Sequence, residues 1–241
     1  RAGATVAETA AGAEVFVLCV GNDDDVRQVV GEALPAMAPG GVVVDHTTTS
    51  AVVARDMAEL AAQSGRSFVD APVSGGQAGA ENGQLTIMCG GEPAAFGKIE
   101  PVVGAYAKAT RLMGGPGSGQ LTKMVNQICI AGVVQGLAEG LHFAKRAGLD
   151  PQAVYEAISK GAAQSWQMDN RWKTMSDGKF DFGFAVDWMR KDLGLVLDEA
   201  GRNGAALDMT AMVDGFYADV QKLGGQRWDT SSLVARLEKP E

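Results

Sequence analysis

The stretch from Gly114 to Asn126, GGPGSGQLTKMVN, decides the organisation of this chain. Its glycines, spaced G-x-x-G-x-G, lead directly into a helical pattern that carries Lys123 near its start. Glycine permits positive φ angles and a close approach of a ligand to the main chain, and the unpaired N–H groups of a helix N-terminus attract anions. Lys123 and Asn126 share one helix face because they are three residues apart. The stretch therefore indicates a ligand site, and a plain linker before a solvated lysine is the alternative.

A long apolar helix is predicted to follow, because residues 128–148 (ICIAGVVQGLAEGLHFAKRAG) are apolar on nearly every face as far as Leu141. Such a helix is buried, either inside a large protein or in a membrane. Its polar interruptions are Asn126, Gln127, Gln135 and Glu139. They are too frequent for a membrane span. A buried helix seldom leaves a lysine free in water near its start, so we expect Lys123 to face a cleft.

Before the glycines, short apolar runs alternate with helical patterns. We expect strands at residues 14–20, 42–45, 67–73, 84–90 and 109–113, and helices at 26–38, 51–63 and 93–106. This alternation predicts a parallel, doubly wound sheet. Ligands of such sheets bind beyond the carboxyl ends of the strands. Here those ends carry small or hydroxyl-bearing residues at positions 19–21, 46–50 and 74–76.

After the glycines only helical patterns follow, at residues 118–148, 150–161, 165–176, 184–203 and 209–223, with a short closing helix from 231. The predicted fold is therefore α/β: a Rossmann-type, doubly wound parallel sheet domain, residues 1–116, and an all-helical domain, residues 117–241, joined by the long helix. The chain opens on Arg1 rather than methionine, in the middle of the strand–helix pattern. We therefore expect the N-terminal part of the sheet domain to be missing.

The composition argues against several classes of function. The net charge is −8 without a basic run, so nothing indicates binding to nucleic acid or to an anionic membrane. Three cysteines lie in apolar surroundings without metal-like spacing, which predicts buried thiols and a reducing, cytoplasmic environment. Asp45-His46 has the form of a metal or acid–base pair, and residues 23–25 form an acidic cluster. Structural roles are the stronger interpretation of both, the cluster as a helix cap, so no metal site is expected.

At three stretches the chain resembles the β-hydroxyacid dehydrogenases, the group of 3-hydroxyisobutyrate dehydrogenase and tartronate semialdehyde reductase. Residues 70–76 (DAPVSGG) are similar to the substrate-binding signature of that family, residues 114–126 to its catalytic signature, and residues 191–198 (KDLGLVLD) to its cofactor-contacting one. The resemblance covers the full length of the chain. Two departures stand out: the family's initial G-x-G-x-x-G is not found, and Gln127 stands where many relatives have asparagine.

The resemblance implies reversible oxidation of a small 3-hydroxy acid, or reduction of the matching semialdehyde, with Lys123 as general acid and base. Partial burial lowers the pKa of a lysine, so that the amine can exchange a proton with the substrate oxygen. The implied substrate-binding residues are Ser74, Gly75, Gly76, Phe184, Asp192 and either Asn126 or Gln127. The implied residues for NAD or NADP are Cys19, Val20, Asp24, Thr48, Gly117, Gly119 and Lys191. For Thr48, a helix-capping role is an equally strong interpretation.

Other functions remain open at this point. A relative acting on a phosphorylated substrate, like 6-phosphogluconate dehydrogenase, would need a second anion site, and only Arg66 and Arg111 come near Ser74 in sequence. Imine reductases share the architecture but usually lack the lysine. A non-catalytic module that binds a nucleotide or a partner protein is a third possibility. The resemblance also implies a homodimer or homotetramer, because the family's long helix commonly packs between subunits, whereas the choice between NAD and NADP cannot be inferred.

Overall fold

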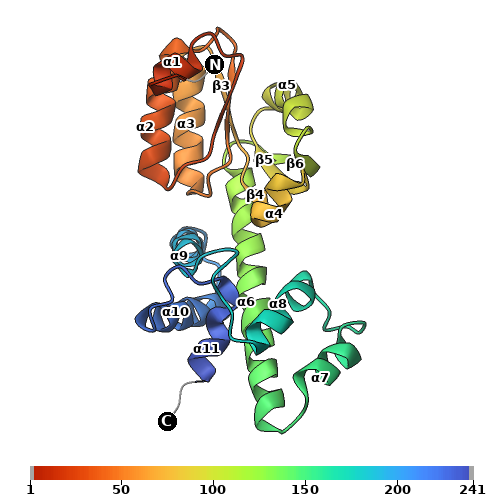
Figure 1. Ribbon diagram of the computed structural model, residues 1–241. Helices are drawn as coiled ribbons and strands as arrows, with labels where there is room; N and C mark the ends of the chain where they lie inside the picture. Colours follow the sequence, from red (N-terminus) through yellow and green to blue (C-terminus); the bar gives the residue numbers. More distant parts are fainter. Residues whose placement is uncertain (1–2, 239–241) are drawn as a thin grey trace. The chain divides into compact units, whose positions relative to one another are not determined.

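The computed structural model describes residues 3–238 and divides into two compact units, Arg1–Val125 and Asn126–Glu241 (Figure 1). The first unit is built around a mixed sheet, and the second is helical. The boundary between them falls inside one helix, α6 (Ser118–Arg146).

The sheet of the first unit has six strands, of which β1, β2 and β3 are parallel neighbours in that order. The strands are β1 (Val15–Leu18), β2 (Val42–Asp45), β3 (Ser67–Asp70), β4 (Val73–Ser74), β5 (Leu85–Gly90) and β6 (Ala107–Gly114). The parallel arrangement predicted for the whole sheet is wrong at β5, which runs antiparallel to β3 and β4. The reason is the short α4 (Gly76–Glu81) between β4 and β5, because a parallel crossover needs about a dozen residues or more.

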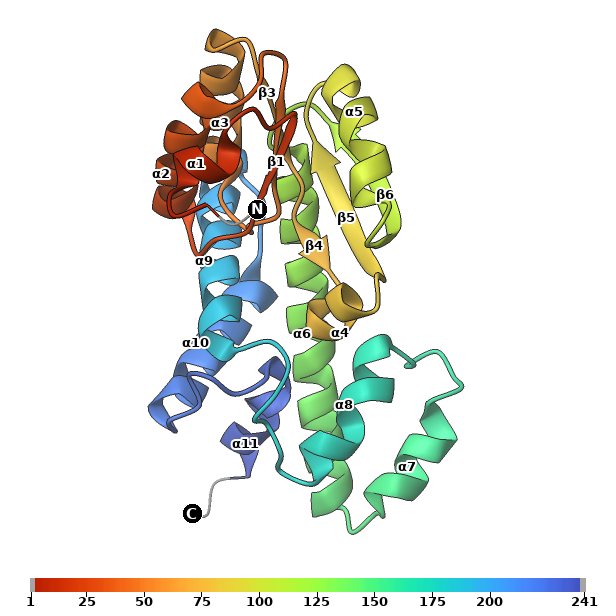
Figure 2. The ribbon, with the colours of Figure 1, turned by 45° about the horizontal axis from the view of Figure 1, so that its top comes forward.

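Helices cover both faces of this sheet (Figure 2). Along β2 successive side chains point to opposite faces: Val43 packs in one apolar cluster, and Val42 and Val44 pack in another. The helices on the Val43 side are α1 (Val6–Ala10), α2 (Asp23–Ala33), the 3-10 turn η1 (Leu34–Ala36) and α3 (Ala51–Gln63). The opposite side is covered by α5 (Pro93–Val103). The three buried valines explain why this strand could be predicted from its apolar run.

Two residues of the acidic cluster make contacts near the starts of α2 and α3. The cap of α2 itself is Asn22, which accepts from the N–H of Asp25. Asp23 accepts from both the N–H and the hydroxyl of Ser50, and Ser50 in turn caps α3. Asp25 accepts from the N–H of Gly21. These contacts favour a structural role for Asp23 and Asp25. Among residues 3–238, no group of three or more acidic, histidine or cysteine side chains is arranged to hold a metal ion.

The second unit packs its helices around the part of α6 that follows Asn126. They are α7 (Pro151–Ile158), α8 (Trp166–Ser176), α9 (Val186–Asn203), α10 (Asp208–Lys222), the 3-10 turn η2 (Thr230–Ser232) and α11 (Leu233–Leu237). Val134, Leu137 and Leu141 of α6 enter one buried cluster with side chains from α8 to α11. Their spacing of three and four residues places them on one face of the helix.

The opposite side of α6 is less buried than the sequence predicts. Val125, Val133 and Phe143 are exposed, Phe143 by 70%, and Cys129 is exposed as well. Cys19 is also exposed, so the prediction of buried thiols is right for Cys89 alone. By length and composition α6 could cross a membrane, but a core helix of a soluble protein passes the same test. Its packed face accounts for much of its apolar content.

Candidate functional site

Lys123 lies beside the segment that carries the serine–glycine–glycine turn. It is the sixth residue of α6, and only 8% of it is exposed. Its Nζ donates a hydrogen bond to the carbonyl oxygen of Val73 at 2.8 Å. Val73 directly precedes Ser74, so the lysine and the serine–glycine–glycine turn are brought together within the first unit.

The turn itself depends on glycine. Ser74 ends β4 and is half-buried, whereas Gly75 and Gly76 are exposed. Gly75 has a φ of 131° and Gly76 a φ of 61°. Residues with a Cβ rarely adopt such angles. The main chain of this turn is therefore open to a ligand beside a hydroxyl group.

The carboxylate of Asp70 caps the start of α6. Its Oδ1 accepts from the N–H of Gly117 at 2.8 Å, and its Oδ2 accepts from the N–H of Gln120 at 2.9 Å. Asp70 is fully buried at the end of β3. Burial raises the pKa of this carboxyl to about 6, and the N–H groups of Gly117 and Gln120 oppose that rise. The anion expected at this helix N-terminus is therefore the protein's own aspartate.

The fit of Asp70 also explains two glycines. A Cβ on Gly119 would collide with the carbonyl oxygen of Met88 and would lie 2.6 Å from that of Asp70. A Cβ on Gly90 would lie 2.5 Å from Asp70 Oδ1. Binding of a cofactor by Gly117 and Gly119 remains a prediction, and the N–H of Gly117 is already engaged.

Gln120 connects the start of α6 to the end of β2. It is fully buried; its Nε2 donates to the carbonyl oxygen of Thr47 at 2.7 Å, and its Oε1 accepts from the N–H of Thr49 at 3.1 Å. Thr47 Oγ1 accepts from the N–H of Val20 after β1. Thr48, half-buried, lies between two anchored threonines. Asp70 and Gln120 were not among the predicted site residues. The available signal was that Asp70 directly precedes one run of small residues, 71–76, and Gln120 directly follows another, 114–119.

The cofactor candidates of the first unit fit the edge where such sheets bind nucleotides. Cys19 and Asp24 are exposed, and Thr48 is half-buried, at or after the carboxyl ends of the adjacent parallel strands β1 and β2. The N–H of Val20 is engaged by Thr47. Binding of a dinucleotide by Cys19, Val20, Asp24 and Thr48 remains a prediction.

Asp45 and His46 have separate structural environments. Asp45 accepts from the N–H of Thr47 at 2.9 Å, and burial raises its pKa to about 7. His46 Nδ1 lies 2.6 Å from the carbonyl oxygen of Ala71, and Nε2 lies 2.8 Å from the hydroxyl of Tyr106. Because a carbonyl only accepts, Nδ1 carries the proton and Nε2 accepts from the tyrosine. Burial lowers the pKa of His46, so the neutral ring fits this arrangement.

The raised pKa of Asp45 predicts a stability that falls with pH. The folded state holds this proton up to about pH 7, whereas the unfolded chain releases it near the ordinary aspartate pKa of 3.8. The free energy of unfolding should therefore fall as pH rises from about 4 to about 7, by at most about 1.4 kcal/mol per unit of pKa difference. Asp45→Asn should flatten this slope in urea titrations. An unaltered slope in Asp45→Asn would contradict the assignment.

The candidates of the second unit are held by their own contacts. Gln127 is 2% exposed, and its Nε2 donates to Asp192 Oδ2 at 2.7 Å. Asn126 Nδ2 donates to Gln127 Oε1. Lys191 Nζ lies 3.4 Å from Asp192 Oδ1. The sequence did not decide whether Asn126 or Gln127 binds the substrate. Of the two, Gln127 is the one whose side chain bonds to a residue of α9, Asp192.

Phe184 lies just before α9, and 37% of it is exposed. Its N–H donates to Asp229 Oδ2 at 3.0 Å. Asp229 also forms an ion pair with Arg171 at 3.0 Å. The main chain at Phe184 is therefore anchored while its ring remains accessible.

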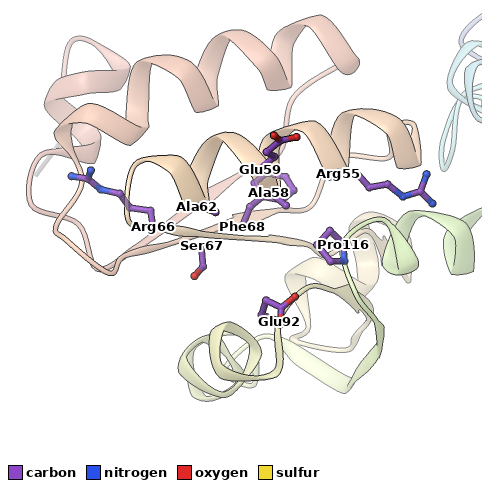
Figure 3. Close-up of a pocket in the computed structure, with 9 residues that line it drawn as sticks. All are labelled: Arg55, Ala58, Glu59, Ala62, Arg66, Ser67, Phe68, Glu92 and Pro116. Carbon is purple, nitrogen blue, oxygen red and sulfur yellow. The ribbon is translucent and has the colours of Figure 1, made fainter.

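A cavity of about 460 Å³ lies elsewhere in the first unit, along β3 (Figure 3). It is lined by Arg55, Ala58, Glu59, Ala62, Arg66, Ser67, Phe68, Glu92 and Pro116. None of the predicted site residues is among them. Arg66, considered as a second anion site, donates to the carbonyl oxygens of Ser64 and Met37.

Comparisons with known proteins show the family of this chain. A family described as the NAD-binding domain of 6-phosphogluconate dehydrogenase matches residues 1–115. A second, described as NAD-binding of NADP-dependent 3-hydroxyisobutyrate dehydrogenase, matches residues 117–237. The chain is thus matched by nucleotide-binding families along nearly its whole length.

Individual relatives are similar over most of their own length. An "uncharacterized oxidoreductase" of Shewanella frigidimarina is 63% identical over 98% of this chain and 82% of that protein. A "probable 3-hydroxyisobutyrate dehydrogenase-like 1, mitochondrial" of Arabidopsis thaliana is 38% identical over 98% of this chain and 73% of that protein. The solved 3-hydroxyisobutyrate dehydrogenase of Mycobacterium tuberculosis with L-serine has a TM-score of 0.89 at 27% identity, covering 98% of this chain and 84% of that one. The chain therefore belongs to the β-hydroxyacid dehydrogenase family, whose cofactor is NAD or NADP.

Proposed function

We propose that this protein oxidises a small 3-hydroxy acid, or reduces the matching semialdehyde, with Lys123 as the general acid and base. The observation that carries the proposal is the hydrogen bond from Lys123 Nζ to Val73, one residue before Ser74. It holds a buried amine close to the half-buried Ser74 and the exposed main chain of Gly75 and Gly76. Such a pairing suits a substrate with a hydroxyl group near a carboxylate.

Lys123 would exchange the proton of the substrate hydroxyl. In oxidation, its neutral amine accepts this proton; in reduction, its ammonium group donates it to the oxygen of the aldehyde. The nicotinamide accepts or supplies the hydride when it is bound. Because Val73 offers only an acceptor, its carbonyl oxygen orients the lysine in either protonation state.

The serine–glycine–glycine turn would bind the substrate carboxylate. The Ser74 hydroxyl and the main-chain N–H groups of Gly75 and Gly76 are the proposed donors. The family resemblance implies substrate-binding roles for Asn126, Phe184 and Asp192 as well, and Gln127 would hold Asp192 through its hydrogen bond. These roles follow the family resemblance and the contacts of each residue within its own unit.

The choice of substrate class is supported by the named relatives. L-serine, present in the mycobacterial structure, is itself a 3-hydroxy acid, and the Arabidopsis protein is named for 3-hydroxyisobutyrate. A phosphorylated substrate is disfavoured because both Arg66 Nη atoms already donate to main-chain carbonyls. A homodimer or homotetramer and a cytoplasmic location remain predictions.

A spectrophotometric screen at about 340 nm, where reduced nicotinamide absorbs, tests the proposal. The purified protein is assayed with NAD and NADP against 3-hydroxy acids, 2-hydroxy acids and 6-phosphogluconate, and in reverse with semialdehydes. We expect turnover with a non-phosphorylated 3-hydroxy acid or its semialdehyde. Activity confined to 6-phosphogluconate, or to 2-hydroxy acids, would contradict the proposed substrate class.

A further inference from the structure

We propose that Asp70 is a positioning residue for Lys123, which it holds in place by fixing the start of α6 to the end of β3. This inference rests on the proposed function of Lys123. It concerns a residue that neither contacts the lysine in the described hydrogen bonds nor belongs to the exposed turn. Its role follows from two contacts between residues 70–73 and the start of α6, one made by Asp70 and one by Val73.

The two points of attachment lie on the same short segment, residues 70–73. At its first residue, the Asp70 carboxylate accepts from the N–H groups of Gly117 and Gln120 at 2.8 and 2.9 Å. At its last residue, the Val73 carbonyl oxygen accepts from Lys123 Nζ at 2.8 Å. The main-chain N–H of Gln120 and the side chain of Lys123, about one helical turn apart, therefore both bond to this segment.

The Asp70 carboxylate is closely packed on all sides at the start of α6. Asp70 has no exposed surface. The positions of Gly90 and Gly119 leave no room for a Cβ against its atoms. A buried carboxylate that accepts from two main-chain N–H groups fixes how the first turn of α6 is rotated about the helix axis and where it lies along that axis. Because Lys123 lies one turn further along the same helix, its position is fixed as well.

The segment also carries the proposed substrate turn, since Ser74 follows Val73 directly. Asp70 therefore sets the lysine and the turn relative to each other through one continuous stretch of main chain. Misplacement of a catalytic group by about 1 Å can cost about 100-fold in rate. A weakened cap should thus act on turnover more than on coenzyme binding.

The test compares Asp70→Asn and Asp70→Ala with wild-type protein. Asn keeps one acceptor oxygen but places an NH₂ group against the second N–H, and Ala removes both acceptors. We expect kcat to fall by about 10- to 100-fold in Asp70→Asn and further in Asp70→Ala, with the Kd of the coenzyme unchanged. Hydrogen exchange at residues 117–121 and acylation of Lys123 by acetic anhydride should both become faster.

The control is Ile99→Ala, which removes buried methyl groups from α5 in the same unit. It should lower the thermal midpoint while leaving kcat and Lys123 acylation at the wild-type values. A purely structural role of Asp70 predicts the same pattern for the Asp70 variants. That pattern, or faster exchange and acylation with unchanged kcat, would overturn the proposal.

Two further results are possible: the wild-type protein shows no activity with hydroxy acids, or the Asp70 variants do not fold. In both cases the proposal is tested by measurements that need no turnover. If the wild-type protein acts on no hydroxy acid, the proposed function fails, and the positioning is judged by exchange and acylation alone: acceleration upholds it and no change overturns it. If the Asp70 variants do not fold, amide hydrogen exchange in the wild-type protein tests the proposal. The N–H groups of Gly117 and Gln120 must then exchange as slowly as those of β3, because a first helical turn offers them no other acceptor.

Discussion

Lys123→Ala should reduce kcat by about two to four orders of magnitude, the range expected when a general acid–base group is removed. The Kd of the coenzyme should stay close to the wild-type value, because the amine is proposed to act on the substrate oxygen. The measurements are steady-state kinetics in both directions and coenzyme titration by fluorescence. They separate loss of chemistry from loss of binding.

The structure offers a matched control for this variant. Lys98 also donates from Nζ to a main-chain carbonyl oxygen, that of Gly40 at 3.0 Å, in the same unit but at an exposed position. Lys98→Ala removes an equivalent contact and should leave kcat unchanged. Equal losses of kcat and coenzyme affinity in Lys123→Ala would contradict the assigned role, as would a kcat within about tenfold of wild type.

Much of this fold could be predicted from local patterns. The apolar run Val42–Val44 indicated a strand buried on both faces, and it is one. The hydroxyl of Ser50 indicated a helix start, and it caps α3. Such features depend on neighbours within a few residues, so the sequence contains all that is needed to infer them.

Features that depend on distant partners could not be predicted in the same way. Asp70 and Gly117 are separated by 47 positions, and nothing local to either residue shows that they meet. The glycines before α6 indicated an external anion, because the sequence does not show that an internal carboxylate takes this place. The reversal of β5 also depends on which strand it pairs with. Lys123 was predicted to face a cleft, but its contact with Val73 and the Asp70 cap before it were not predicted.

The largest effect on stability is expected from Gly119→Ala, in the first turn of α6. Alanine is favoured over glycine in a helix by about 1 kcal/mol, so propensity alone would stabilise the protein. The added Cβ, however, would collide with the carbonyl oxygen of Met88 and approach the main chain and carboxylate of Asp70. These neighbours belong to two strands of the sheet and cannot rotate away, so overpacking should cost about 3 kcal/mol or more.

Gly97→Ala provides the comparison, because Gly97 lies inside α5 and a Cβ there would meet nothing within 4 Å. It should raise the free energy of unfolding by about 0.5–1 kcal/mol, whereas Gly119→Ala should lower it, both measured by urea denaturation. If Gly119→Ala proves as stable as wild type, the start of α6 can move away from β3 without penalty. In that case the Asp70 cap does not fix the start of the helix. Opposite signs for the two substitutions would instead show that close packing against the sheet, rather than helix propensity, requires glycine before the lysine.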